Sequence, residues 1–188
     1  MKINKLLIGI NGANGIIGSA IKKELELNEN YKIYSIKKRI KNTKSIIDEI
    51  QNFDIFINNV YDHAHDQNQL NLLFELYTSW REDNRLIINI GSRSYLPNIS
   101  KGFKYSTFKN ALNHFSDLVT IQDINKKCRI TTINPGYVRE KNKYALSPID
   151  VAKTIKWIIE LPSYIEISRI DLNHKAPYLI VQKSKEKI

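Results

Sequence analysis

Apolar residues occur along this chain in short blocks that predict a regular alternation of strands and helices. The apolar runs have the length of buried strands, and the segments between them carry apolar residues at helical spacing. The predicted strands cover residues 5–10, 31–36, 53–59, 85–90, 129–133 and 165–172. The predicted helices cover residues 19–27, 43–51, 70–80, 105–120 and 147–161. This order predicts an α/β, doubly wound fold whose central sheet is mostly parallel and carries helices on both faces.

Length and composition indicate an ordinary globular protein. The 188 residues, of which 42% are hydrophobic, are expected to form one domain over residues 1–188, with 183–188 as a frayed tail. The single cysteine, Cys128, excludes an internal disulfide framework and suits a reducing cytoplasm. No apolar run reaches membrane-spanning length, and the run at the amino terminus is too short for a signal peptide. We therefore expect a cytoplasmic protein with no membrane partner.

Two classes of site are disfavoured by the distribution of charged and metal-binding residues. The formal charge of +10 suggests nucleic-acid binding, but lysines are scattered from Lys2 to Lys187 without a dense arm or an aromatic-interleaved patch. A phosphorylated cofactor or an acidic substrate suits this charge better. His63 and His65 lie close together in a polar segment, but no third ligand accompanies them. The sequence therefore predicts neither a nucleic-acid partner nor a metal site.

Three glycines lie between the first predicted strand and the first predicted helix. Their Gly-x-x-Gly-x-x-Gly spacing permits a tight turn and a close approach of the backbone to a pyrophosphate at the helix amino terminus. The residues assigned to a dinucleotide here are Gly12, Asn14, Gly15, Ile16, Ile17 and Gly18. A plain glycine turn without a ligand is the alternative.

The second predicted strand is followed by three basic residues, Lys37, Lys38 and Arg39. In a dinucleotide-binding fold this strand end faces the adenosine ribose, where an acidic residue binds the 2′-hydroxyl and basic residues suit a 2′-phosphate. No Asp or Glu occurs between residues 31 and 47. We therefore favour NADP(H) over NAD(H), with a solvated basic turn as the alternative.

Ser92, Tyr105 and Lys109 are the candidates for proton transfer. Tyr105 and Lys109 are four residues apart, so they share one face of the predicted helix, and Ser92 follows the strand that ends at residue 90. A neighbouring cation favours the phenolate and brings a tyrosine toward a useful pKa. The chain contains two other Tyr-x-x-x-Lys pairs, but only this one has a serine thirteen residues upstream.

These features together resemble the short-chain dehydrogenase/reductase family, which comprises NAD(P)-dependent oxidoreductases with a Rossmann fold. The resemblance extends over about residues 5–172 and includes Asn58-Asn59 and Pro135-Gly136-x-Val138. It implies that Tyr105 is the general acid or base, that Lys109 lowers its pKa and binds the nicotinamide ribose, and that Ser92 binds the substrate carbonyl.

The resemblance also implies roles outside the proton-transfer set. The cofactor contacts implied beyond the glycine turn are Asn58, Asn59, Val60, Ile90, Tyr105, Lys109, Pro135, Gly136 and Val138. A helix asparagine of the family supports the lysine through water. For this supporting asparagine, Asn68 fits the spacing of the family slightly better than Asn71 does.

Among the departures of the chain from the family pattern, three concern the sheet, the cofactor and the substrate pocket. The strand whose acidic residue contacts adenine is missing, so we expect about six strands. Val60-Tyr61 replaces a small Ala-Gly pair after the two asparagines, which is expected to crowd the cofactor. About seven residues connect Val138 to the helix beginning at Ser147, which predicts a shallow, open substrate pocket.

The leading hypothesis is an NADP-dependent oxidoreductase that acts on a carbonyl or alcohol, either a small molecule or a larger, partly exposed substrate. The alternative is a non-catalytic dinucleotide-binding or regulatory module on the same fold. The family resemblance further implies a homodimer or homotetramer, formed through the helices that carry Asn71 and Tyr105.

Overall fold

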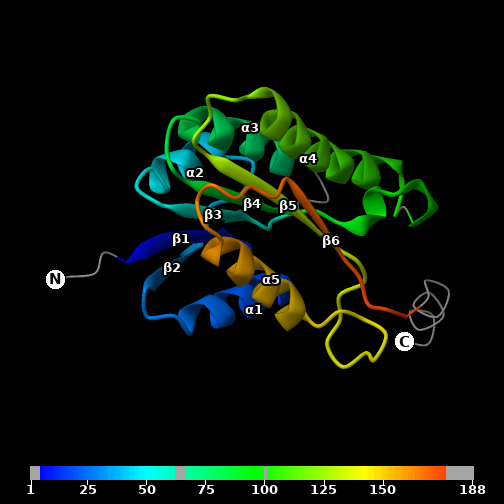
Figure 1. The fold of residues 1–188 in the computed structure, drawn as a ribbon. Coiled ribbons are helices and arrows are strands. Elements are labelled where there is room, and N and C mark those ends of the chain that lie inside the picture. The colour runs from blue at the N-terminus through cyan, green and yellow to red at the C-terminus, as the bar shows by residue number, and fades with distance from the viewer. Residues whose placement is uncertain (1–4, 62–66, 100, 177–188) are drawn as a thin grey trace.

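A parallel sheet divides the molecule into two helical layers (Figure 1). The computed structural model describes residues 5–61, 67–99 and 101–176. Within these residues the six strands have the order β2-β1-β3-β4-β5-β6, and all five pairings are parallel. The strands are β1 (Leu6–Asn11), β2 (Tyr31–Ile36), β3 (Ile55–Asn58), β4 (Leu86–Ile90), β5 (Arg129–Pro135) and β6 (Arg169–Leu172). The predicted doubly wound Rossmann fold, with about six strands, is confirmed.

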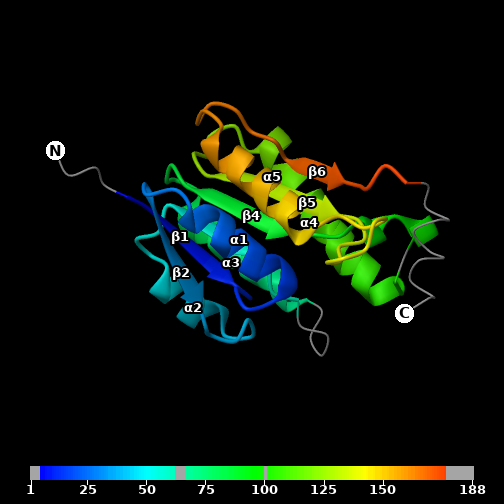
Figure 2. The same ribbon diagram turned by 90° about the horizontal axis from the view of Figure 1, so that it is seen from below.

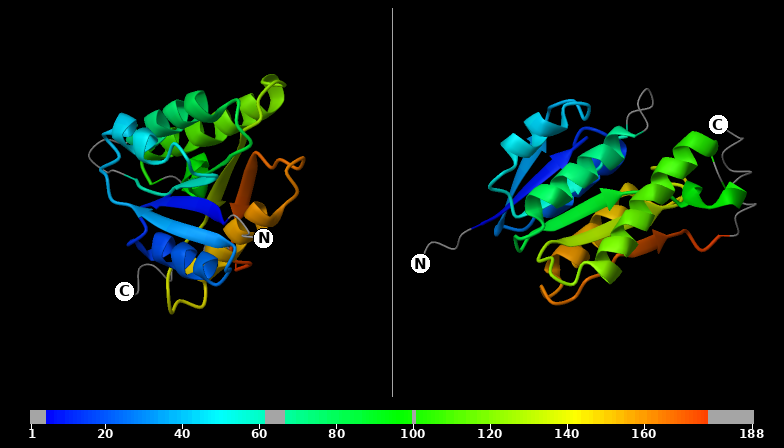
Figure 3. Two further views of the ribbon diagram at one scale, coloured as in Figure 1. Left: turned by 90° about the vertical axis from the view of Figure 1, so that its left-hand side faces the viewer. Right: turned by 90° about the horizontal axis from the view of Figure 1, so that it is seen from above.

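The helices cover both faces of the sheet (Figures 2 and 3). One face carries α1 (Ile16–Glu26) and α5 (Pro148–Glu160), which pack against each other. The other face carries α2 (Thr43–Glu49), α3 (Asn68–Trp80) and α4 (Phe103–Gln122). Two short 3₁₀ helices, η1 (Arg93–Tyr95) and η2 (Pro97–Ile99), lie between β4 and α4. Among the described helices, none combines the length and apolar character needed to cross a bilayer.

Alternate side chains of the central strands form two apolar cores. On β3, Ile55 and Ile57 join the cluster under α1 and α5, whereas Phe56 joins the cluster under the other three helices. Successive strand residues point to opposite faces, so a strand covered by helices on both sides must be apolar throughout. This explains why these strands appear in the sequence as unbroken apolar runs.

The order of the strands reverses between β1 and β3. The chain moves from β1 outward to β2, then returns to the far side of β1 as β3 and continues to β6. Ligands of open α/β sheets bind at such a switch point, beyond the carboxyl ends of the strands. The glycine turn after β1 and the asparagines at the end of β3 therefore lie side by side at the expected ligand edge.

The boundaries of some predicted elements differ from the structure. The last strand was expected from residue 165, but β6 begins at Arg169. The side chain of Glu166 instead accepts hydrogen bonds from the Ile130 backbone N–H (3.0 Å) and from Lys126 Nζ (2.6 Å). These side-chain contacts, rather than strand pairing, hold the segment just before β6. The predicted tail at 183–188 lies outside the described residues.

Ser147 caps helix α5, which the sequence predicts to begin at this residue. The Ser147 hydroxyl accepts a hydrogen bond from the Ile149 N–H (3.3 Å), and the Asp150 carboxylate accepts one from the Ser147 N–H (2.8 Å). This reciprocal pair satisfies backbone donors that the first helical turn leaves free. The cap also fixes the residue at which the connection from β5 to α5 ends, and so limits the size of the loop beside the site.

Candidate functional site at the carboxyl edge of the sheet

The turn between β1 and α1 has the form expected of a phosphate-binding loop. Gly12 has a φ of +66°, in the left-handed region, and the Gly15 N–H donates to the Gly12 carbonyl (3.1 Å). A Cβ on Gly18 would lie 2.1 Å from that same carbonyl oxygen, so only glycine permits this approach of helix to turn. No side chain caps the start of α1 at Gly15. The residues present therefore fit a pyrophosphate bound at the helix amino terminus.

Buried amide side chains connect this turn to the next strands. The Asn11 side chain accepts hydrogen bonds from the backbone N–H groups of Asn59 (2.5 Å) and Val60 (2.9 Å), and donates to Asn58 Oδ1 (3.1 Å). Asn58 Nδ2 in turn donates to Asn89 Oδ1 (3.1 Å) and to the Gln69 carbonyl (3.0 Å). Asn58, expected to contact the cofactor, is fully buried and serves this network.

The same network holds Lys109. Lys109 Nζ donates to Gln69 Oε1 (2.7 Å) and to the Ile90 carbonyl (2.8 Å). Gln69 Nε2 donates to the carbonyls of Asn58 (2.8 Å) and Ile90 (3.1 Å), so the glutamine is itself fixed at both ends. Only 3% of Lys109 is exposed, and this burial lowers its pKa from 10.5 to about 7.

Gln69 is a site residue that sequence reasoning missed. The supporting role was assigned to Asn68, but the side chain that directly contacts Lys109 is the neighbouring Gln69. Asn68 is also buried at the start of α3, and its support of Lys109 through water stays a prediction. Nothing in a single sequence marks this glutamine as a site residue, because its role depends on a contact with a residue 40 positions further along the chain.

Ser92 and Tyr105 meet at the end of β4. The Ser92 N–H donates to Asn134 Oδ1 (3.2 Å), and its hydroxyl accepts from the Ser94 N–H (3.1 Å). A side-chain hydrogen bond joins Ser92 to Tyr105. Lys109 Nζ lies 5.7 Å from the centroid of the Tyr105 ring. The structure thus brings the three predicted proton-transfer residues together.

The pKa of Tyr105 differs from expectation. We expected Lys109 to lower it, but burial raises the Tyr105 pKa above its usual value of 10, and the hydrogen bond with Ser92 opposes this only in part. The prediction of a lowered pKa is therefore wrong for the protein alone. The reason is that helical spacing places Lys109 beside Tyr105 but says nothing of burial, which disfavours the charged form of both side chains.

A second tyrosine, Tyr61, lies at the same place. Its ring packs edge-on against the Tyr105 ring, with centroids 4.7 Å apart and an angle of 81° between the planes. Lys109 Nζ lies 5.1 Å from the Tyr61 ring centroid. The sequence predicted that Val60 and Tyr61 would crowd the cofactor. It did not show that the Tyr61 ring lies over the Lys109 ammonium.

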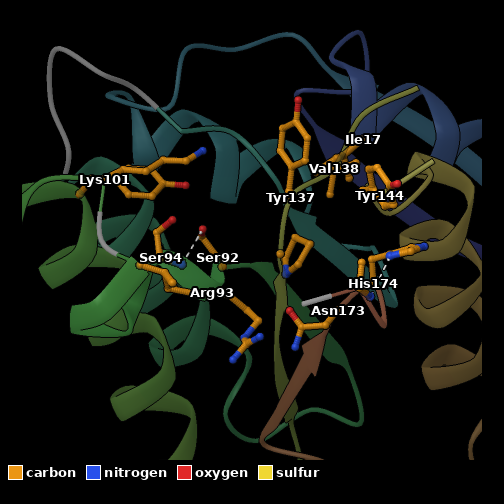
Figure 4. A pocket seen from close by; sticks show the side chains of 16 residues that line it. Ile17, Ser92, Arg93, Ser94, Lys101, Tyr137, Val138, Tyr144, Asn173 and His174 are labelled. Carbon is orange, nitrogen blue, oxygen red and sulfur yellow. Dashed lines mark hydrogen bonds between the residues drawn. The ribbon is translucent and has the colours of Figure 1, made fainter. Parts of the chain in front are cut away.

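A cavity of about 430 Å³ opens beside Ser92 and Tyr105. Ser92, Ser94 and Lys101 lie on one side, and Tyr137, Tyr144 and His174 lie on the other (Figure 4). The connection that contributes Tyr137 and Tyr144 is short and closed by hydrogen bonds from the Arg139 N–H to the Leu146 carbonyl (3.0 Å) and from the Leu146 N–H to the Tyr137 carbonyl (2.8 Å). The connection between β5 and α5 is therefore a short, closed loop, and the shallow, open substrate pocket stays a prediction.

Some of the predicted residues line the cavity and others lie away from it. Those that line the cavity are Ile17, Ser92, Tyr105, Pro135, Gly136 and Val138. The basic residues after β2 are exposed, and Lys38 Nζ donates to the Ser45 carbonyl (2.9 Å) and lies 3.4 Å from Glu49 Oε2. The Ile90 side chain is buried, and its carbonyl binds Lys109 and Gln69.

The described residues were compared with the arrangement that a metal ion requires. Among them, no group of three or more His, Cys, Asp or Glu side chains is arranged to hold a metal ion. His63 and His65 lie outside this part of the chain.

The lowered pKa of Lys109 predicts a pH dependence of stability. Between about pH 7 and 10.5 the unfolded chain binds more protons than the folded chain, so this group makes the folded state more stable as pH rises. Relative to Lys109→Met, the free energy of unfolding of the wild type should increase by about 3 kcal/mol from pH 7 to 9.5. Urea unfolding measures the difference, with the exposed Lys101→Met as control. A pH-independent difference would mean that Lys109 has an ordinary pKa.

Comparison with known proteins identifies the fold. A serine dehydrogenase from Escherichia coli aligns with a TM-score of 0.67 and 21% identity, over 89% of this chain and 97% of that chain. An alcohol dehydrogenase from the archaeon Thermococcus sibiricus, complexed with 5-hydroxy-NADP, aligns with a TM-score of 0.67 and 16% identity, over 92% and 99%. A short chain dehydrogenase from Leptospira borgpetersenii serovar Hardjo-bovis, with bound NAD⁺, aligns with a TM-score of 0.73 and 18% identity, over 91% and 92%. No protein-family model and no curated protein matches the sequence. The chain has the fold of the short-chain dehydrogenases and reductases.

Proposed function

We propose that this protein is a member of the short-chain dehydrogenase/reductase family and an NADP(H)-dependent oxidoreductase of a carbonyl or alcohol substrate. One observation carries the proposal: Ser92 and Tyr105 line the cavity at the carboxyl edge of the sheet, and the buried Lys109 lies beside them, with Nζ 5.7 Å from the centroid of the Tyr105 ring. The glycine turn lies at the same edge. A structural role alone gives no reason for a serine, a phenol and a costly buried ammonium to meet beside a cavity.

The cofactor would lie across this edge. Gly12, Gly15 and Gly18 would bind the pyrophosphate, and Pro135 to Val138 would border the nicotinamide. The bound nicotinamide supplies the hydride. The preference for NADP(H) rests on the exposed cations Lys37, Lys38 and Arg39 after β2 and on the absence of a carboxylate between residues 31 and 47.

The residues of the cavity account for the proton chemistry. In reduction, the Tyr105 hydroxyl gives its proton to the substrate oxygen as the carbonyl carbon gains a hydride; in oxidation, Tyr105 receives that proton. The Ser92 hydroxyl donates a hydrogen bond to the same oxygen, where negative charge develops. Lys109 would bind the ribose hydroxyls and orient the nicotinamide.

Three further parts of the proposal concern the substrate, the oligomeric state and the cellular compartment. The short connection between β5 and α5 leaves room for a small substrate or for part of a larger one. Phe74, which is 42% exposed, and Phe115 form a ring pair on α3 and α4, with centroids 4.9 Å apart. These two helices would form a homodimer or homotetramer contact. A single buried thiol, Cys128, suits residence in the cytoplasm.

A second function is favoured by one specific observation. Tyr61 packs over Lys109, the residue that would bind the cofactor ribose. A non-catalytic dinucleotide-binding or regulatory module would tolerate this obstruction permanently, whereas an enzyme must relieve it.

Tyr105→Phe is the first test of catalysis. It removes the proton donor but keeps the ring, so turnover of NADPH with a panel of aldehydes and ketones should fall at least about a hundredfold while NADPH binding is kept. Ser92→Ala should lose activity to a similar degree, and Tyr164→Ala, at an 86% exposed position, serves as control. Wild-type protein that binds NADPH but reduces nothing in the panel would support the regulatory module instead.

The basic residues after β2 predict the cofactor preference. Thermal stabilisation by NADPH should exceed that by NADH, and the double variant Lys37→Ala, Lys38→Ala should reduce the NADPH effect while leaving the NADH effect unchanged. Lys41→Ala, another exposed lysine nearby, controls for general charge. Equal stabilisation by both cofactors in every variant would contradict the assignment of a 2′-phosphate site.

A further inference from the structure

Asn134 holds the backbone of Ser92, the residue whose hydroxyl would bind the substrate oxygen. It is fully buried at the end of β5, and its Oδ1 accepts a hydrogen bond from the Ser92 N–H (3.2 Å). A Cβ on Gly91 would lie 2.1 Å from the same Oδ1, so the amide lies directly against the backbone at the end of β4. The direction of the Asn134 amide therefore determines whether the Ser92 N–H has an acceptor.

Two acceptors face the other end of this amide. Asn134 Nδ2 donates to Asn113 Oδ1 (2.8 Å) on α4 and to Asp171 Oδ1 (3.0 Å) on β6. Asn113 does not fix the direction of the amide, because an amide side chain can present either an acceptor or a donor. Asn113 Nδ2 is itself buried and has no acceptor among the described residues. If both amides reversed, this donor would gain Asn134 Oδ1 as a partner.

Asp171 opposes that reversal. An ionised carboxylate only accepts hydrogen bonds, so an Asn134 oxygen turned toward Asp171 would face a second oxygen with no proton between them. The sheet itself places this carboxylate, because Asn134 and Asp171 are partners in the register of β5 and β6. The other oxygen, Asp171 Oδ2, accepts a hydrogen bond from the Tyr95 hydroxyl (2.8 Å) in the 3₁₀ turn η1, directly after Ser92. One carboxylate thus contacts both the amide beside Ser92 and the turn that follows Ser92.

We propose that Asp171 is a positioning residue: its carboxylate fixes the direction of the Asn134 amide, and the amide fixes the Ser92 backbone and hence the Ser92 hydroxyl. The inference rests on the proposed function. It adds to the site a residue of the edge strand β6 that is not among the described residues lining the cavity. Asp171 contacts neither substrate nor cofactor, so its substitution should affect catalysis only through Ser92.

Asp171→Asn is the variant that separates charge from shape. It keeps the size of the side chain but adds a donor for a reversed Asn134 oxygen, so the Ser92 N–H loses its acceptor. Asp171→Ala removes the acceptor without adding a donor and should have the same effect to a smaller degree. Tyr95→Phe removes only the other hydrogen bond of the carboxylate. Asp48→Asn, at an exposed position on α2, is the matched control. Asp171 is itself exposed, so these variants should fold, and circular dichroism checks this.

Hydrogen exchange of the Ser92 backbone N–H measures its hydrogen bond with no cofactor or substrate present. NMR spectra of ¹⁵N-labelled protein follow the exchange. We expect the Ser92 N–H to exchange about tenfold faster in Asp171→Asn than in the wild type, as for the loss of one hydrogen bond. Tyr95→Phe and Asp48→Asn should match the wild type. The Ile88 N–H, in the middle of β4, should exchange equally in all the proteins, which excludes a general loss of stability.

Turnover of NADPH with the panel of aldehydes and ketones measures the effect on catalysis. In Asp171→Asn, kcat should fall roughly tenfold while the KM for NADPH is unchanged, because Ser92 stabilises the substrate oxygen and not the cofactor. In a Ser92→Ala background, Asp171→Asn should have no further effect, since the residue through which it acts is already lost. A merely structural role would lower kcat in both backgrounds.

The outcomes distinguish this inference from the proposed function. Unchanged exchange of the Ser92 N–H in both Asp171 variants would show that the carboxylate does not fix the amide. An equal loss of kcat with and without the Ser92 hydroxyl would show that Asp171 does not act through Ser92. Either result overturns the inference while the proposed function stands. If the wild type turns over no compound of the panel, the proposed function fails and the inference fails with it, whatever the exchange rates are.

Discussion

The burial of the Lys109 ammonium beneath the carboxyl edge of the sheet is the constraint on which the rest of the site depends. A buried ammonium without partners costs several kcal/mol, so the fold must supply fixed acceptors. It does so through Gln69 and the Ile90 carbonyl, and Gln69 is itself fixed by Asn58. Asn58 is bonded to Asn11 at the end of β1. Elements distant in sequence are thereby tied to the position of one amine.

Neutral amides are well suited to this role. They satisfy backbone and side-chain groups in the interior without adding a second buried charge. A separate amide, Asn134 at the end of β5, accepts from the Ser92 N–H and donates to Asn113 Oδ1 (2.8 Å) on α4. Ser92 is therefore positioned by β5 and α4, while Lys109 is positioned by α3 and β4. Ser92 and Lys109 meet at Tyr105, so the chemistry depends on the placement of α3 relative to α4.

The sequence predicted the fold class and the proton-transfer residues, but not the environment of those residues. Buried parallel strands leave apolar runs that can be read directly, and Tyr105 and Lys109 share a face through helical geometry alone. Gln69 and Tyr61 were not identified as contacts of Lys109, because those contacts arise from tertiary packing across 40 residues or more. The direction of the Tyr105 pKa was wrong for the same reason: spacing determines neighbours, whereas burial is a property of the whole fold. The start of β6 was misplaced because Glu166 forms side-chain bonds that no periodicity reveals.

A crystal structure of the protein with NADPH tests the central claim most directly, namely that the carboxyl edge around Lys109 is a nicotinamide dinucleotide site. The account predicts density for the pyrophosphate at the amino terminus of α1, the nicotinamide beside Ser92 and Tyr105, and ribose hydroxyls at Lys109. Dinucleotide bound elsewhere, or an edge that stays free of ligand at saturating NADPH, would contradict it.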